Sequence, residues 1–180
     1  SIHVRQSLLK LGVQMENIEL FKQTMDWFSS KLDFNPFVTF YLNYIEPTYN
    51  GYYGAFIIFL VWLLSFFTAP RKKIQPVFLV CVALALTCIF EGLFYTSRAF
   101  VTTSMIESSP FYSRLNDAEK ETLNAKIDDL IRFKNTAEST KNDGISKDKL
   151  PYIETKKIIY SVIVENNCCQ SYNKMNSDNQ

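Results

Sequence analysis

The hydrophobic positions of this chain are concentrated in its middle third, and the flanking segments are largely polar. Residues 52–69 form an uncharged run that, as a helix, would be ~27 Å long, close to the thickness of a bilayer's hydrocarbon core. A second uncharged run starts at Pro76 and reaches about residue 98 if Glu91 is accommodated. We therefore predict two transmembrane helices, 52–69 and 76–98. The alternative, a buried hairpin in a soluble protein, would need more apolar surface elsewhere than the chain has.

A short basic turn separates the two predicted crossings. Pro70 ends the first helix, and Pro76 suits the first turn of the second. Between them, Arg71, Lys72 and Lys73 place the 70–76 turn on the cytoplasmic or matrix side by the positive-inside rule. Both termini are then expected on the opposite side. The three cations also form a predicted site for anionic lipid headgroups such as cardiolipin.

The segment before the crossings, residues 1–50, is predicted to hold two helices. The first has apolar residues at steps of three and four: Leu8, Leu11, Met15, Ile18, Phe21, Met25, Phe28 and Leu32. Acidic residues among its cations favour packing on a protein partner over lying on a membrane surface. Asn35 and Pro36 start a second helix, which ends by Pro47. The aromatic residues around it are expected to form an interfacial belt.

Residues 102–180 are polar, with one clear helix signal. Asn116 and Glu119 form a capping box, which predicts a helix over about 116–135 with Leu123 and Ile127 on its apolar face. Residues 153–165 fit a helix face and a short strand equally well. The predicted fold is an all-α membrane protein. It consists of a two-helix transmembrane hairpin (51–101) with amphipathic helical flanks, 1–50 and 102–180, on the same side of the membrane.

Two stripes of residues stand out on the second crossing. Small side chains recur at steps of four and three and predict a helix-packing face: Cys81, Ala85, Cys88 and Gly92. Glu91 is an acidic residue embedded in an apolar run, which is by default a functional hypothesis. Its predicted role is a structural ion pair with Arg98, two turns further along the helix, or with a cation on a neighbour. A proton relay through a Glu91 carboxyl of raised pKa is the alternative.

Residues that could carry catalysis are scarce. Lys and Arg number 19 against 18 for Asp and Glu, so no net field attracts nucleic acid. The single histidine is His3, and neither predicted crossing contains a His or Met ligand. Cys168 and Cys169 are adjacent and lack the C-x-x-C spacing of metal sites; redox activity, a bridge to a partner and no function at all stay open. We therefore expect no catalytic residues, no metal site and no cofactor, with structural phospholipid as the one expected ligand.

This organisation leads to an expected function by analogy of architecture. We expect a non-catalytic accessory subunit of a multisubunit energy-transducing complex, a respiratory-chain (electron-transport) complex or an ATP synthase, that contributes scaffold, lipid binding and subunit contacts. No N-x-Ser/Thr acceptor or secretory signal is visible, which favours the mitochondrial inner membrane, with the 70–76 turn in the matrix and both termini in the intermembrane space. The endoplasmic reticulum membrane is the alternative compartment. The alternative function is a small channel or proton-conducting protein that uses Glu91.

Overall fold

The computed structural model describes residues 2–42, 59, 63, 75–137 and 144–177, and these are mostly helical. They form two compact units. The first joins residues 1–32 to residues 99–180, and the second consists of residues 33–98. The N-terminal helix and the C-terminal region therefore share one core, although the whole second unit separates them in the sequence.

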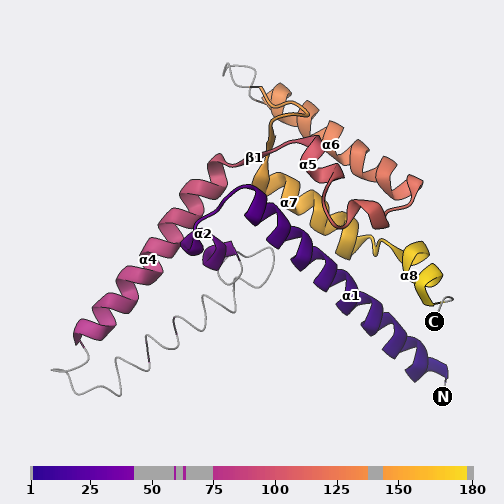
Figure 1. Cartoon of the computed structure of the whole chain (residues 1–180), viewed down its shortest axis with the longest axis horizontal. Coiled ribbons are helices and arrows are strands. Elements are labelled where there is room, and N and C mark those ends of the chain that lie inside the picture. Colours follow the sequence, from indigo (N-terminus) through magenta and orange to yellow (C-terminus); the bar gives the residue numbers. More distant parts are fainter. Residues whose placement is uncertain (1, 43–58, 60–62, 64–74, 138–143, 178–180) are drawn as a thin grey trace. The chain divides into compact units, whose positions relative to one another are not determined.

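In the first unit, helix α7 (Tyr152–Tyr160) lies between α1 (Ile2–Lys31) and α6 (Asp117–Ala137) (Figure 1). A π-helical turn, η3 (Ser161–Glu165), continues α7. Residues 153–165, for which the sequence permits a helix or a strand, are thus helical. Their β-branched residues lie three and four apart, so Ile159, Val162 and Ile163 are all buried on one side.

Helix α6 begins at the capping box that the sequence predicts. The Asn116 side-chain oxygen accepts from the Glu119 amide at 2.8 Å, and a Glu119 carboxylate oxygen accepts from the Asn116 amide at 3.1 Å. The helix spans Asp117–Ala137, close to the predicted 116–135. Leu123 and Ile127 are buried, as expected for its apolar face. At the C-terminal end of α6, Asn135 bonds both the amide (2.9 Å) and the carbonyl (3.0 Å) of Ile145.

The periodicity of α1 predicts one apolar face, but the face that α1 buries coincides with it only in part. Towards α7 and η3 it buries Asn17, Leu20, Phe21, Thr24, Met25 and Phe28. Leu11, Met15 and Ile18 belong to the predicted apolar stripe, yet they are 56, 66 and 38 % exposed. Phe21, Met25 and Phe28 of the same stripe are buried, so only part of the predicted apolar face packs inside this unit, and the predicted contact with a protein partner stays a prediction. The side chains that do line the core include Asn17 and Thr24, polar residues that no hydrophobic pattern selects.

The all-α expectation needs one correction, because the first unit contains a small sheet. Strand β1 (Phe100–Val101) pairs antiparallel with β2 (Leu150–Pro151). Short helical elements complete the unit: α5 (Thr103–Glu107), η2 (Tyr112–Arg114) and α8 (Gln170–Ser177). Helix α8 forms in the tail although the sequence there shows no apolar pattern. The largest fully buried side chains of this unit include Phe21, Phe28, Phe111, Ile106, Leu123, Leu150, Ile159 and Ile163.

The second unit contains α4 (Gln75–Arg98) and α2 (Pro36–Phe40), which pack on each other (Figure 1). The bounds of α4 agree with the predicted second crossing, and within the described residues it is the one helix long and apolar enough to span a membrane. Asn35 caps α2, with Pro36 in its first turn, as predicted. Apart from Phe59 and Leu63, the first predicted crossing lies outside the described residues, and so do residues 70–74 of the basic turn. The two-helix hairpin therefore stays a prediction.

Candidate functional site

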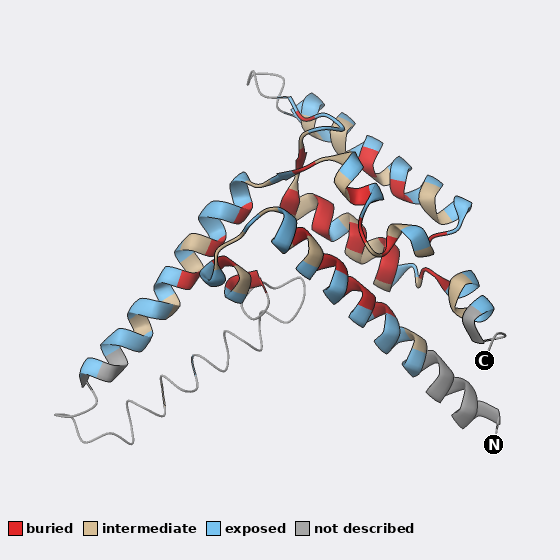
Figure 2. Cartoon of the chain, viewed as in Figure 1, coloured by how far each residue is buried: buried red, intermediate tan, exposed pale blue. Residues whose placement is uncertain are grey.

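The outer surface of α4 is the most unusual feature of the second unit. Only 17 % of the residues in its apolar window, which falls within Leu79–Arg98, are buried (Figure 2). Large apolar side chains are exposed on several sides of the helix: Leu79, Val80, Leu84, Leu86, Phe90, Leu93, Phe94 and Tyr95. Such a surface is rare on a soluble helix, which exposes its polar face.

Helix α2 and the residue that caps its C-terminus, Tyr41, pack against one end of the small-residue stripe. A Cβ atom on Gly92 would overlap the ring of Tyr41, so the absence of a side chain at Gly92 is what permits this contact. Cys88, one turn earlier, is buried; Ala85 is half-buried and Cys81 is exposed. The structure therefore brings α2 to the Cys88–Gly92 end of the stripe, while Cys81 stays accessible.

Glu91 has a different partner from the predicted one. The Asn35 side-chain amide donates to the Glu91 carboxylate at 2.6 Å, while the Asn35 oxygen accepts from the Val38 amide at 2.9 Å. The Arg98 guanidinium lies over the Phe94 ring at 4.2 Å from its centroid, and no ion pair within the described residues joins it to Glu91. The predicted Glu91–Arg98 pair is thus corrected. The two residues are two turns apart along the axis, ~10 Å, and each has a nearer partner.

The C-terminal end of α4 combines a cation with aromatic rings. Phe94 and Tyr95 make an edge-to-face contact, with their ring centroids 5.4 Å apart. The Arg98 guanidinium covers the Phe94 ring of this pair. An amphipathic Tyr and a long Arg at the end of an apolar helix are typical of the membrane–water interface. This end of α4 therefore has the composition of an interfacial anchor.

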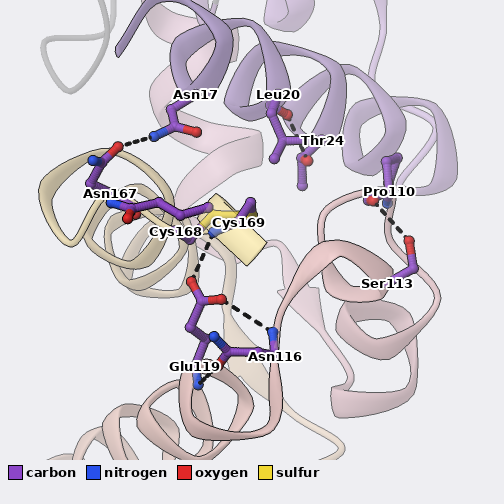
Figure 3. The surroundings of a disulfide bond; sticks show 11 residues. Asn17, Leu20, Thr24, Pro110, Ser113, Asn116, Glu119, Asn167, Cys168 and Cys169 are labelled. Atoms are coloured by element: carbon purple, nitrogen blue, oxygen red, sulfur yellow. Dashed lines mark hydrogen bonds between the residues drawn. A yellow bond between two sulfur atoms is a disulfide. The ribbon is translucent and has the colours of Figure 1, made fainter. Parts of the chain in front are cut away.

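A second candidate site, in the first unit, surrounds a disulfide bond between the adjacent Cys168 and Cys169 (Figure 3). Glu119 reaches it with the carboxylate oxygen that the capping box does not use, which accepts from the Cys169 amide at 2.9 Å. On the other side, the Asn17 side chain donates to the Asn167 side-chain oxygen at 2.5 Å. Through these two hydrogen bonds, the turn formed by residues 167–169 connects α6 to α1.

The chemistry of this turn follows from its burial. Both cysteines are 1 % exposed, and Asn167 and Cys169 have the left-handed φ values of 50° and 71°. The ligand atoms of Glu119, Cys168 and Cys169 lie within 4.8 Å of one another, as a metal site requires. A metal ligand, however, is a thiolate, and these sulfurs are bonded to each other. As it stands, the cluster is a structural junction. Sequence reasoning found the capping role of Glu119 but had no signal for its second contact.

Comparison with protein-family models, with curated proteins and with solved structures finds no match for this chain. Any functional assignment therefore rests on the surfaces and contacts described above. Two features stand out. The first is the exposed apolar helix α4, whose Glu91 accepts a hydrogen bond from Asn35. The second is the Cys168–Cys169 turn, which connects α6 to α1 in the first unit.

Proposed function

We propose that the chain is a membrane-anchored, non-catalytic subunit of a multisubunit membrane complex. The observation that carries the proposal is the exposed apolar surface of α4. Full burial of one Leu or Phe side chain is favourable by about 1.5–3 kcal/mol, and the side chains named above are about half exposed. Their exposure to water therefore costs on the order of 10 kcal/mol. Hydrocarbon or another hydrophobic helix removes that cost. The predicted first crossing, 52–69, would provide the second helix of the hairpin.

The surroundings of Glu91 support a structural role for this carboxylate. A hydrogen bond to a charged group contributes about 1.5–3 kcal/mol, more than a neutral one. The Asn35 amide that donates this bond belongs to the residue that caps α2, so the carboxylate and the helix cap stabilise each other. A proton-conducting function would instead require Glu91 to exchange partners during each transfer. For this reason we propose the scaffold function and not the channel.

The proposed topology places the 70–76 turn on the matrix or cytosolic side and residues 99–180 on the other. The disulfide between Cys168 and Cys169 supports this assignment, because disulfides persist on oxidising sides of membranes and are rare in reducing compartments. The compartment in the proposal is the mitochondrial inner membrane, and the complex is a respiratory-chain complex or an ATP synthase. The endoplasmic reticulum membrane is the alternative.

Membrane anchoring can be tested with a matched pair of variants in the full-length chain. Phe90 on α4 and Phe133 on α6 are 73 and 70 % exposed. Phe90→Asp places a charge on the apolar surface of α4, where insertion of Asp costs about 2.5–3.5 kcal/mol. We expect this variant to lose resistance to alkaline extraction from membranes, whereas Phe133→Asp should be retained like the wild type. Extraction of the wild type would contradict membrane anchoring, and equal behaviour of the two variants would contradict the role of α4 as an anchoring helix.

Membership of a complex and lipid binding need separate measurements. On native gels in mild detergent, the tagged chain should migrate with a complex much larger than its own 20.9 kDa. Migration as a small homo-oligomer alone would contradict a role as accessory subunit. Replacement of Arg71, Lys72 and Lys73 by Gln should reduce retention of anionic lipid, since each cation near an anionic surface contributes about 1 kcal/mol. Unchanged lipid content and unchanged topology would remove the headgroup site from the proposal.

A further inference from the structure

Helix α1 carries two apolar stripes on different sides. The first faces the core of its own unit and includes Leu20, Phe21 and Phe28. The second consists of Leu11, Met15 and Ile18, which we call the outer stripe, and its members are 56, 66 and 38 % exposed. At 100° per residue the centres of the two stripes are roughly 120° apart, so the elements that cover the first leave the second open. The outer stripe is therefore available for a contact outside this unit.

The spacing of the outer stripe is that of a coiled coil. Its residues follow one another at steps of four and three. In the sequence the same steps continue back to Leu8 and Val4, which gives a positions at Leu8 and Met15 and d positions at Val4, Leu11 and Ile18, about two heptads; the next a position holds Lys22, where the apolar seam ends. A lone surface helix does not need this regularity, whereas a partner helix packed along the seam does.

Gly12 provides a second, independent observation. It lies in the interior of α1, at the edge of the outer stripe beside Leu11, where a glycine destabilises a helix relative to alanine. Nothing in the described part of the chain lies within 4 Å of where its Cβ would be, so no contact there explains the glycine. A small residue at a helix surface permits close approach of a second backbone. Gly12 thus indicates where another helix would come nearest.

We infer that the outer stripe binds a second copy of this chain, with the two α1 helices antiparallel. A two-fold axis beside residues 12–13 would bring the two copies of Gly12 together. It would also place Leu11 of each copy against Met15 of the other. The contact would lie in the first unit and does not require α4 to span a membrane.

The charges along the edge of the stripe identify a second copy as the occupant. In the sequence, Arg5 and Glu19 both occupy e positions of the heptad, seven residues to either side of Gly12. In the antiparallel arrangement e positions meet across the axis, so position 5 of one copy faces position 19 of the other, twice per dimer. In a parallel pair e positions face g positions, which hold uncharged residues here: Ser7, Gln14 and Phe21. The helix is therefore complementary to itself in one orientation.

Charge reversal in the full-length chain in detergent tests this arrangement. The measurement is molar mass by light scattering over a series of protein concentrations. The wild type should form a dimer. Glu19→Arg and Arg5→Glu should each raise the dissociation constant about tenfold, because two attractive pairs become repulsive. Glu16→Arg makes the same change one turn away, outside the stripe, and should leave the constant unchanged.

A mixture of the two single variants decides whether the contact is between copies. In a mixed dimer the carboxylate introduced at position 5 faces the guanidinium introduced at position 19, and the unchanged Arg5 and Glu19 meet at the other end. Mixing Arg5→Glu with Glu19→Arg should therefore restore association.

Failure of the mixture to recover would overturn the inference, as would a monomeric wild type or an equal effect of Glu16→Arg. A further variant, Leu11→Asp, separates a second copy from a different partner. Loss of a larger complex on this substitution, with a monomeric purified wild type, would assign the stripe to a different protein and would also overturn the inference.

Discussion

Asn35 joins α2 to α4 through two hydrogen bonds, and a pair of substitutions can separate them. Asn35→Ser keeps a good N-cap for α2, because Ser and Asn are about equal in this position, but its hydroxyl is too short to reach Glu91. Removal of the bond to the Glu91 carboxylate should cost about 1.5–3 kcal/mol. Asn35→Ala also removes the cap and should cost about 1 kcal/mol more.

Hydrogen exchange of the α2 amides in the full-length chain is the suitable assay, because a short docked helix opens locally before the whole protein unfolds. The expected cost corresponds to exchange roughly ten- to a hundredfold faster in Asn35→Ser. Thr87→Val is the matched control, since the Thr87 hydroxyl is exposed and bonds the Ala83 carbonyl within α4 at 2.8 Å. Wild-type protection of α2 in Asn35→Ser, or equal acceleration in the control, would refute the reasoning.

Three further substitutions test the packing of each unit. Glu119→Ala removes the acceptors of the Asn116 and Cys169 amides and leaves the Asn116 side chain as N-cap, and chemical denaturation should report a loss of about 2–4 kcal/mol. Glu121→Ala, which is exposed on the same helix, should stay within about 0.5 kcal/mol. Gly92→Ala forces its new Cβ into the Tyr41 ring, so the amides of α2 should lose protection from hydrogen exchange. The double variant Gly92→Ala/Tyr41→Ala should recover part of that protection. Full protection in the single variant would show that α2 does not depend on this contact. Leu123→Ala, which truncates a fully buried side chain of α6, should cost about 2–5 kcal/mol in the same denaturation experiment, and a loss below about 1 kcal/mol would contradict its place in the core.

Several features of this protein follow from the sequence because their causes are local. The bounds of α4 follow from an apolar run that begins at a proline, is interrupted by Glu91 and ends at Arg98. The start of α6 follows from Asn116 and Glu119, which bond each other across three residues. The start of α2 follows in the same way from Asn35 and Pro36. At the two helix starts all the interacting groups lie within one helical turn.

The tertiary structure decided everything that depends on groups distant in the sequence. Periodicity correctly places α1 in a helix, but which side is buried depends on α7 and η3, which lie in the C-terminal part of the chain. Residues 153–165 are helical because their apolar residues fill the space between α1 and α6, although β-branching alone permits a strand.

The same holds for the partners of charged groups. From sequence, the nearest cation on the same stripe, Arg98, is the reasonable partner for Glu91, but the fold brings Asn35 within 2.6 Å across 56 residues. The capping carboxylate of Glu119 likewise gains a second bond to the Cys169 amide, 50 residues away. A hydrogen bond needs its two atoms within about 3 Å, and only the packing of helices sets distances of that kind between segments far apart in the chain.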